Sequence, residues 1–498
     1  MTFGDLIRAS RSLAVPGLAD AGGLADRRVA SIAYDSRDVV AGSIFVALKG
    51  AKLDGARFAM DAATRGAIAI VSDGPAPDEI PAGPVWLSVS NARAALAELA
   101  AIFFGRPSEQ LTLVGVTGTN GKTTTTYLLA AIFDAAGISC GRIGTVTTRI
   151  GDEEREAART TPEAPDLQRL LREMVERGLG ACAMEASSHA LALHRVDDLR
   201  FAAGVFSNLT RDHLDFHGDM EKYLAAKRRL FEMLPAGAPA IINIDDPRGA
   251  DLAASVARPV TYAIDRPADI APRQLTYSLD GLSFDVQTPR GTLHVRSPLV
   301  GRPNAYNILA ATATAAALDL PFDAIERGLA ALTAVPGRFE MASAATDDVR
   351  VVVDYAHTDD ALKNLLETAR PLAAGRLITV FGCGGDRDAT KRPLMGAVAA
   401  RLSDLVIVTS DNPRSENPER IISEIRRGMT REQGAVIEIV DRRQAIDRAI
   451  REARPGDLVL IAGKGHEKYQ VIGDRTIPFD DVEVAGAALE RRRSGTRV

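Results

Sequence analysis

A glycine-rich run with a single lysine, Thr117–Thr124, contains the residue types that most directly suggest chemistry. An apolar strand-like run, Leu111–Val116, precedes it, and a helical pattern, Thr125–Ala136, follows it. In a strand–loop–helix of this kind, backbone N–H groups and the helix N-terminus bind phosphate oxygens. Lys122 can neutralise phosphate charge, and the Thr123 hydroxyl can bind Mg²⁺. The run therefore predicts a nucleotide site, although a valine stands where the strict motif has its first glycine.

Three further polar side chains follow in the same part of the chain. Glu185 lies at the end of a strand-like run, Ala181–Ala186, and a carboxylate beside a phosphate loop is a natural Mg²⁺ ligand. His213 and Lys227 lie downstream, the lysine in a helical pattern. Taken singly, each is better explained as an ordinary residue of a surface loop or a solvated helix. A phosphate loop by itself is common to switch GTPases, kinases, transporters and ligases, so these residues alone leave the reaction open.

Four more segments with reactive side chains follow predicted strands nearer the C-terminus. The strands are Val349–Asp354, Leu377–Phe381, Leu405–Thr409 and Leu458–Ala462. The segments after them are Tyr355–His357, Gly382–Arg387, Asp411–Arg414 and Gly463–Glu467. Strands that alternate with amphipathic helices predict a mainly parallel sheet, and ligands bind beyond the carboxyl ends of such strands. The four segments therefore predict a single ligand site.

Three regions of different character must position these residues, and we expect one domain from each. Short strand-like runs, Ser43–Leu48 and Ala67–Val71, mark the first region, and apolar runs such as Ala202–Ser207 and Ala240–Ile244 mark the second. The second region ends in three short strands separated by turns at 275–297, a pattern typical of an antiparallel meander. The expected domains are 1–106, 107–335 and 336–498. The predicted fold is α/β, with a small N-terminal domain, a central parallel-sheet phosphate-loop domain and a Rossmann-like, doubly wound C-terminal domain.

The composition narrows the class of protein. The 498 residues are 46% hydrophobic and 25% charged, as expected of a globular enzyme. A net charge of −5 argues against broad nucleic-acid binding. Cys140, Cys182 and Cys383 are too widely spaced for a disulfide framework or a zinc knuckle, and we expect buried thiols. The N-terminus lacks the apolar core of a signal peptide, and no run is long enough to span a bilayer. We expect a cytoplasmic monomer with no membrane partner.

Several of these motifs together resemble the Mur ligase family. They are Gly118–Thr123, Met184–His189, Asp212–Asp215 with Lys227, Asp354–His357 and Gly463–Glu467. The resemblance covers nearly the whole chain with the motifs in the right order. Within the family it is closest to the synthetases that add the third residue of the muramoyl peptide.

The resemblance implies an ATP site and two magnesium ions. The implied ATP-binding residues are Gly118, Thr119, Asn120, Gly121, Lys122, Thr123, Thr124, Asn304, Asn307, Arg338 and Asp354. Thr123 and Glu185 would bind the Mg²⁺ on the ATP phosphates, and His213 with a carbamylated Lys227 would help to hold a second ion. Addition of CO₂ turns the cationic amine into an anionic oxygen ligand, which suits a metal. Lys122, Glu185, His213 and Lys227 are the implied catalytic residues.

The resemblance also implies two substrate sites. Residues expected to bind a UDP-muramoyl peptide are Ser36, Thr160, Thr161, Ser187 and Arg195. Residues expected to bind the incoming amino acid are Arg387, Asp411, Asn412, Pro413, Arg414, Gly463 and Glu467. Asp-Asn-Pro-Arg is typical of the diaminopimelate-adding members of the family. Diaminopimelate differs from lysine by a distal carboxylate, for which the planar guanidinium of Arg414 is a two-pronged partner.

The expected reaction is ATP-dependent amide formation in peptidoglycan synthesis, and thus in cell-wall growth and cell division. The γ-carboxylate of UDP-N-acetylmuramoyl-L-alanyl-D-glutamate would form an acyl phosphate, which the amine of meso-2,6-diaminopimelate attacks, releasing ADP and phosphate. A lysine-adding enzyme, a folylpolyglutamate synthase and a nucleotide-dependent switch without ligase chemistry are the alternatives. Closure of three domains around three ligands would require hinges near residues 106 and 336.

Overall fold

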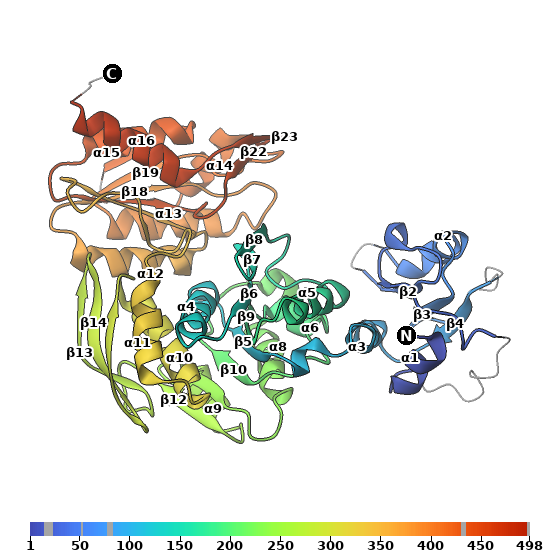
Figure 1. Ribbon diagram of the computed structural model, residues 1–498. Helices are drawn as coiled ribbons and strands as arrows, with labels where there is room; N and C mark the ends of the chain where they lie inside the picture. Colours follow the sequence, from blue (N-terminus) through green and yellow to red (C-terminus); the bar gives the residue numbers. More distant parts are fainter. Residues whose placement is uncertain (14–22, 51–52, 77–82, 430–434, 496–498) are drawn as a thin grey trace.

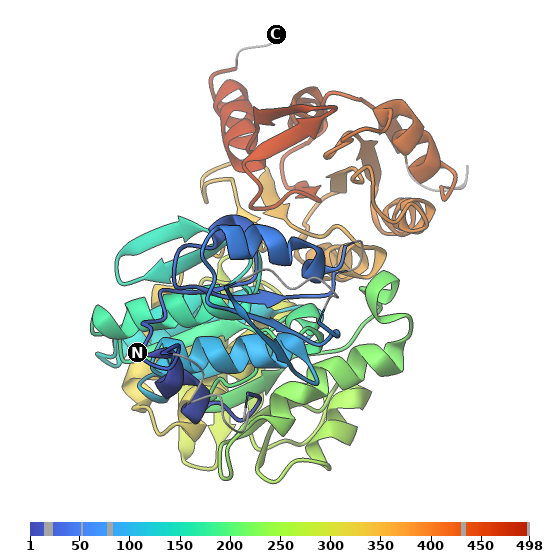
Figure 2. The same cartoon turned by 90° about the vertical axis from the view of Figure 1, so that its right-hand side faces the viewer.

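The computed structural model describes residues 1–13, 23–50, 53–76, 83–429 and 435–495. It shows three α/β domains, with the C-terminal domain above the central domain in two perpendicular views (Figures 1 and 2). The N-terminal domain lies beside the central one in Figure 1 and in front of it in Figure 2. The predicted three-domain α/β class is therefore confirmed. We retain the boundaries at residues 106 and 336 as proposals.

The first domain is a four-stranded parallel sheet covered on both faces. Its strands, in spatial order, are β1 (Ile32–Ala33), β2 (Ile44–Ala47), β3 (Ala69–Ser72) and β4 (Val85–Ser88). Its helices are α1 (Phe3–Ala9), α2 (Ala59–Thr64), α3 (Ala92–Phe103) and the short 3₁₀ turns η2 (Ser36–Asp38) and η3 (Gly55–Phe58). Alternate residues of β2 pack under α1 and α3 on one face and under α2 on the other. Burial on both faces explains the continuous apolar run of this strand.

The central domain is built on an eight-stranded sheet. In spatial order the strands are β12 (Pro259–Tyr262), β11 (Ala240–Asn243), β10 (Ala203–Phe206), β5 (Thr112–Thr117), β9 (Ala181–Glu185), β6 (Cys140–Ile143), β7 (Thr147–Ile150) and β8 (Glu153–Glu156). The first six are parallel, and β7 and β8 are antiparallel additions. The predicted strands β5, β9, β10 and β11 are confirmed to within two residues at each end.

Helices cover both faces of this sheet. One face packs against α4 (Lys122–Ala135), α10 (Arg302–Ala317) and α11 (Phe322–Ala331). The other packs against α5 (Ala164–Glu176), α6 (Ser188–Ala192), α8 (Met220–Glu232) and α9 (Pro247–Ala253). The short helices η4 (Pro107–Glu109) and α7 (Leu214–His217) complete the domain. The predicted meander is confirmed as β13 (Ala271–Ser278), β14 (Gly281–Thr288) and β15 (Gly291–Ser297), all antiparallel.

The start of α4 corrects one prediction. The helix begins at Lys122, whereas the sequence pattern placed its start at Thr125. Gly121 adopts the left-handed conformation (φ 89°) as the residue before the first turn, so the chain turns into the helix at once. Lys122 and Thr123 therefore lie in the first helical turn, where free N–H groups and the positive end of the helix dipole meet a bound anion.

The C-terminal domain is doubly wound, as predicted. Its strands, in spatial order, are β16 (Glu340–Met341), β17 (Arg350–Asp354), β21 (Leu458–Ala462), β18 (Leu377–Phe381), β19 (Leu405–Val408) and β20 (Ala435–Glu438), and only β16 is antiparallel. On one face lie α12 (Asp359–Ala369), the turn η5 (Arg370–Leu372), α13 (Lys391–Leu402) and α14 (Pro418–Arg426); on the other lie α15 (Arg442–Glu452) and α16 (Asp481–Arg493). A hairpin, β22 (Tyr469–Ile472) and β23 (Arg475–Pro478), was not predicted.

The structure also bears on the cysteines and on membrane-spanning helices. The three cysteines are buried free thiols, as predicted. Among the described residues, no helix combines the length and apolar character needed to cross a membrane.

Candidate active site

The phosphate loop between β5 and α4 leaves no room for side chains at two of its glycines. A β-carbon at Gly118 (φ 147°) would lie 1.9 Å from the Ser207 Oγ, and one at Gly121 would lie 2.4 Å from the Asn307 Oδ1. Both positions therefore require glycine, because the neighbouring side chains occupy the space and the backbone angles disfavour other residues. The loop is shaped by contacts with distant segments as well as by its own sequence.

Residues after β10 hold the loop open. Asn208 accepts from the Asn120 N–H through Oδ1 (2.9 Å) and donates through Nδ2 to the Asn120 carbonyl (3.1 Å). The Ser207 hydroxyl donates to the same carbonyl (2.5 Å). Sequence reasoning did not identify Asn208 or Ser207 as functional. The feature that could have identified them is their position directly after β10, the strand that pairs with β5. A loop fixed in advance loses less entropy when it binds phosphate.

Lys122 lies over the loop without a carboxylate partner. Its Nζ donates to the carbonyls of Gly118 (3.0 Å) and Thr119 (2.8 Å). Burial lowers the pKa of its ammonium, and the described residues place no acidic side chain within ion-pair distance. Phosphate oxygens are far better partners for an ammonium than neutral carbonyls, so the arrangement favours an incoming triphosphate.

Glu185 is held rigidly at the end of β9. Its side chain is almost fully buried, and both oxygens accept from Thr145: Oε1 from the backbone N–H (2.8 Å) and Oε2 from the hydroxyl (3.0 Å). The Thr145 hydroxyl also meets that of Thr160 (3.1 Å). Thr145 was missed from sequence because it is distant from Glu185 along the chain. The carboxylate can accept further bonds or bind a cation without reorienting.

Lys227 and His213 come from the chain after β10, and Lys227 contacts the phosphate loop. Lys227 is buried on α8, donates through Nζ to the Gly118 carbonyl (2.7 Å) and lies 4.3 Å from the centre of the Tyr223 ring. Burial, and then the nearby charge of Lys122, lower the pKa of Lys227 well below its usual value. A lowered pKa favours the neutral amine, which is the form that reacts with CO₂. Burial also lowers the pKa of His213 to about 4, which leaves the neutral imidazole that metal binding requires.

The described part of the chain contains no cluster of three His, Cys, Asp or Glu side chains arranged to hold a metal ion unaided. The donors that are present nevertheless suit magnesium: a fixed carboxylate on Glu185, a hydroxyl on Thr123 and a buried amine on Lys227 that carbamylation would make anionic. Phosphate oxygens of a nucleotide would complete such a site. The residues therefore fit Mg²⁺ as part of a nucleotide complex.

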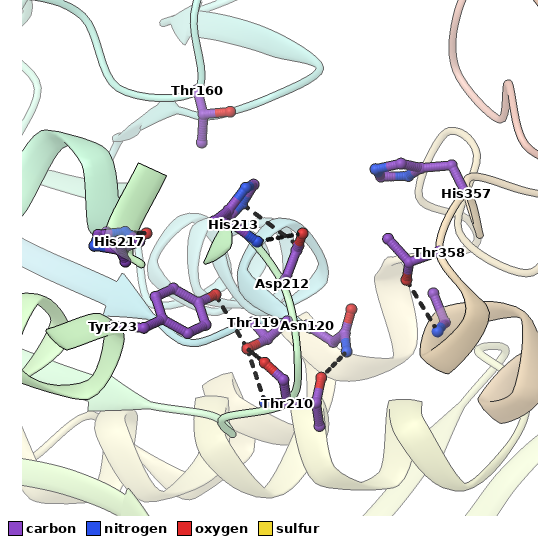
Figure 3. A network of polar contacts seen from close by, with 12 residues as sticks. Thr119, Asn120, Thr160, Thr210, Asp212, His213, His217, Tyr223, His357 and Thr358 are labelled. Carbon is purple, nitrogen blue, oxygen red and sulfur yellow. Dashed lines mark hydrogen bonds and ion pairs between the residues drawn. The ribbon is translucent and has the colours of Figure 1, made fainter. Parts of the chain in front are cut away.

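Residues of the C-terminal domain lie across an open space from the residues of the central domain in Figure 3. His357 and Thr358 face Asp212 and His213 across the space above Asn120 in Figure 3. The two domains are in contact through Arg338, whose Nη2 lies 3.4 Å from the Thr123 Oγ1.

Arg338 is braced by its surroundings. Its guanidinium lies over the Tyr355 ring at 4.8 Å. Asp354 accepts from the backbone N–H groups of Phe339 (2.7 Å) and Ala356 (2.8 Å), and burial raises the pKa of this carboxyl. Asp354 therefore fixes the turn that carries Arg338. Arg338 thus reaches Thr123 at the start of α4, and the role of Arg338 and Asp354 at a nucleotide stays a prediction.

Three other residues expected at the nucleotide lie in α4 or α10. Thr124 is buried within the first turns of α4. Asn307 packs its Oδ1 against Gly121 and donates through Nδ2 to the Asn304 Oδ1 (3.1 Å). Asn304 itself donates to the Val300 carbonyl (2.8 Å), so it supports Asn307 from inside α10.

The residues expected to hold the muramoyl peptide lie beside Glu185. The Thr161 hydroxyl donates to the Glu185 carbonyl (2.7 Å) and lies 3.2 Å from the Ser187 hydroxyl. Arg195 donates through Nη1 to the Thr161 carbonyl (3.1 Å). Ser36 lies apart from them, on η2 of the first domain. Thr160, Thr161, Ser187 and Arg195 are thus brought together around Glu185, whereas Ser36 belongs to another domain.

An arginine cluster joins these two domains and was not predicted. Glu163, which is buried, contacts Arg195 (2.8 Å) and Arg159 (2.9 Å), while Arg93 of α3 lies 3.9 Å away. Three guanidinium groups thus share one carboxylate at the junction. The excess of positive charge suits an acidic ligand lying between the domains. Arg93 could be identified only once α3 was placed against α5.

The segment Asp411–Arg414 is buried up to Pro413 and then turns outward. Arg414 adopts a left-handed conformation (φ 50°) and is paired with the hairpin: its N–H donates to the Val471 carbonyl (3.0 Å), and its carbonyl accepts from the Gly473 N–H (2.7 Å). Its Nη1 donates to the Gly385 carbonyl (2.8 Å). Within the described residues, no carboxylate lies within ion-pair distance of this guanidinium.

The remaining expected pocket residues have distinct positions. A β-carbon at Gly463 would lie 2.7 Å from the Asp411 Oδ2, so this glycine lets the two loops approach. Glu467 bonds to Asn412 (2.8 Å). Arg387 is exposed on the loop after β18 and makes no ion pair with the described residues. Asp411, Asn412, Gly463 and Glu467 are therefore brought together, and the exposed Arg387 lies with Arg414 near Gly384.

Comparison with known proteins gives consistent matches over most of the chain. Family models described as "Mur ligase family, catalytic domain", "Mur ligase middle domain" and "Mur ligase, glutamate ligase domain" match residues 28–104, 116–315 and 337–465. A UDP-N-acetylmuramoyl-L-alanyl-D-glutamate–2,6-diaminopimelate ligase of Solibacter usitatus is 50% identical over 471 residues, covering 94% of each chain.

Solved structures agree with this. A structure of a UDP-N-acetylmuramoyl-L-alanyl-D-glutamate–2,6-diaminopimelate ligase is similar at a TM-score of 0.70 and 34% identity, covering 95% of this chain and 97% of the other. A MurF ligase from Thermotoga maritima in complex with ADP has a TM-score of 0.64 at 20% identity, covering 93% and 99%, which shows a shared fold.

Proposed function

We infer from its membership of the Mur ligase family, to which this chain belongs, that it is an ATP-dependent ligase that adds meso-2,6-diaminopimelate to UDP-N-acetylmuramoyl-L-alanyl-D-glutamate. This is a step of peptidoglycan synthesis, and so of cell-wall growth and division. The observation that carries the substrate choice is Arg414, a half-buried guanidinium with no carboxylate partner among the described residues. The full-length relative from Solibacter usitatus supports the same choice, and nothing favours the lysine-adding, folylpolyglutamate or switch alternatives.

The first step activates the peptide. Thr160, Thr161, Ser187 and Arg195 hold the muramoyl dipeptide beside Glu185, with Ser36 on the nucleotide end of the substrate. The D-glutamate γ-carboxylate attacks the γ-phosphorus of ATP, the bond to the β-phosphate oxygen breaks, and ADP leaves. Lys122 transfers its hydrogen bonds from loop carbonyls to the phosphates and stabilises the charge that develops there.

The second step forms the amide. The neutral diaminopimelate amine attacks the acyl-phosphate carbonyl, the carbon–oxygen bond to phosphate breaks, and inorganic phosphate leaves while the amine proton passes to solvent. Arg414, together with Arg387, binds the distal carboxylate of diaminopimelate, and Glu467 binds the ammonium that does not react, so the amine at the other end is oriented for attack. Asp411, Asn412, Pro413 and Gly463 form the walls of this pocket.

We also propose that Mg²⁺ binds together with ATP. Thr123 and Glu185 would hold one ion, and His213 with Lys227, present as N6-carboxylysine, would hold a second. Bound there, the ions would reduce repulsion between the triphosphate and the attacking carboxylate. The chain's own contribution is a fixed carboxylate, a neutral imidazole and a buried lysine with a lowered pKa.

We further propose that the protein acts as a cytoplasmic monomer, and that its domains, bounded near residues 106 and 336, close around the ligands. Both junctions contain left-handed residues, Arg106 (φ 47°) and Gly337 (φ 65°), where the chain changes direction. These are suitable positions for hinges.

Product analysis tests the function directly. Purified chain incubated with ATP, Mg²⁺, the UDP-linked dipeptide and meso-diaminopimelate should give a product heavier by one diaminopimelate residue, with ADP and phosphate in equal amounts. Omission of the peptide should abolish ADP formation, and omission of the amine should limit it to the single turnover that forms the acyl phosphate. AMP and pyrophosphate as products, or nucleotide hydrolysis independent of both substrates, would rule out the proposed reaction.

A further inference from the structure

Lys464 is a fully buried lysine between two segments of the amino-acid pocket. It follows Gly463 after β21, and its Nζ donates to the Asn412 Oδ1 (3.1 Å) and the Glu467 Oε2 (3.0 Å). The Tyr469 ring lies 5.6 Å from the same atom. A charged group is costly to bury unless it is paired and hydrogen-bonded, and both conditions are met here by residues of the proposed pocket.

The carboxamide of Asn412 is already engaged by the protein. Its Oδ1 accepts from Lys464 and from the Val471 N–H (3.0 Å), and its Nδ2 donates to the Glu467 Oε2 (2.8 Å). Asn412 is also almost fully buried. The side chain is therefore a connector between the two loops and the β22–β23 hairpin, rather than a free ligand for substrate.

Glu467 is held by one oxygen only. Its Oε2 accepts from both Lys464 and Asn412, while no described residue donates to Oε1. Its side chain keeps 19% of its surface exposed, whereas that of Lys464 has none. One oxygen is thus fixed from inside the protein, and the other retains its capacity for an incoming ammonium group.

We propose that Lys464 is a positioning residue for the amino-acid substrate: its ammonium aligns Asn412 and Glu467 so that the unengaged oxygen of Glu467 receives the substrate ammonium. This deepens, and rests on, the proposed function. Lys464 does not touch substrate. The Lys464 ammonium neutralises charge at the Oε2 atom of Glu467 and fixes the direction of that carboxylate. Diaminopimelate therefore meets a carboxylate that is already in place.

Replacement of Lys464 by methionine tests this, with steady-state kinetics as the readout. The KM for diaminopimelate should rise roughly 10- to 100-fold, as is common when a group that orients a ligand-binding side chain is lost. The KM for ATP and the kcat at saturating amino acid should stay close to wild type, because Lys464 makes no contact with the phosphate loop. A general structural defect would lower kcat and alter both KM values.

Lys468→Met is the matched control. This lysine lies four residues away, is largely exposed and pairs with Asp480, so its loss removes the same charge outside the pocket. The KM for diaminopimelate should not change. A second test uses Glu467→Gln as background: if Lys464 acts through Glu467, adding Lys464→Met to it should raise the KM little further.

The outcomes separate the two proposals. If Lys464→Met is unstable in a thermal melt, Lys464→Gln, which retains a donor for Asn412 but carries no charge, is assayed in its place, and a smaller rise in the KM for diaminopimelate is expected. Wild-type activity with an unchanged diaminopimelate KM in the variant overturns this inference alone. Equal KM increases in the wild-type and Glu467→Gln backgrounds also overturn it. Wild-type protein that forms no amide overturns the proposed function, and this inference falls with it.

Discussion

Replacement of Arg414 by alanine is expected to remove most of the preference for diaminopimelate over lysine. The guanidinium is half-buried, and its Nη1 bond to the Gly385 carbonyl leaves its other donors for a ligand. Alanine has the same β-carbon as arginine at this left-handed position (φ 50°), so the substitution adds no new backbone strain. The change therefore removes mainly the charge and the two-pronged donor.

The expected loss in kcat/KM for diaminopimelate follows from the hydrogen bonds between the Arg414 guanidinium and the distal carboxylate. A carboxylate bound by two donors of a guanidinium gains about 1.5–3 kcal/mol from each bond, and partial exposure of Arg414 favours the lower value. A loss of about 3 kcal/mol corresponds to roughly 100-fold in kcat/KM, at about 1.4 kcal/mol for each factor of ten. Lysine has no distal carboxylate, so its much lower kcat/KM should change little.

Phosphate release with each amino acid, under limiting amine, measures both values. Arg414→Gln is the matched control, because its amide can still donate to Gly385 but carries no charge; it should resemble the alanine variant. Arg414→Lys keeps the charge without the planar fork and should lie between that variant and wild type. A kcat/KM for diaminopimelate that survives the alanine substitution within a few-fold would refute this account of the pocket.

Three further predictions concern other parts of the chain. Gly118→Ala places a β-carbon 1.9 Å from a neighbouring hydroxyl at φ 147°, and should weaken ATP binding at least about tenfold in calorimetry while circular dichroism stays native. Because carbamate forms only from a neutral amine and burial lowers the pKa of Lys227, removal of CO₂ and bicarbonate should reduce phosphate release and bicarbonate should restore it; unaffected activity would oppose carbamylation. Burial opposes ionisation of Glu98, but hydrogen bonds from the segment 10–12 lower its pKa to about 2 from an ordinary 4.5. Its stabilisation is therefore complete above about pH 4.5 and lost as the pH falls towards 2, so the melting-temperature difference between wild type and Glu98→Gln should shrink over that range.

Apart from the β13–β15 meander, the strands that the sequence predicted are buried on both faces, although β6, which is also buried, was missed. The runs that became β18 and β21 are continuously apolar because helices cover both sides of the sheet, and their bounds matched. The other missed strands lie at edges or in hairpins. β8 (Glu153–Glu156) is highly charged, and β20 is only partly buried, so neither has the apolar signal of an interior strand.

The candidate site divides in a similar way. The phosphate loop was predicted because its function resides in consecutive residues between a strand and a helix. Thr145 and Asn208 could not be predicted, because they act through contacts with Glu185 and Asn120, 40 and 88 residues away in the chain. Lys464 lies inside a recognised motif, but its role emerges only when the fold brings it against Asn412.

The most direct test of the central claim is a phosphate-release assay of the purified chain with ATP, Mg²⁺, UDP-N-acetylmuramoyl-L-alanyl-D-glutamate and a panel of diamino acids. We expect rapid phosphate release with meso-diaminopimelate and little with lysine, since only the former supplies a distal carboxylate to Arg414. Equal rates with the two amino acids would contradict it.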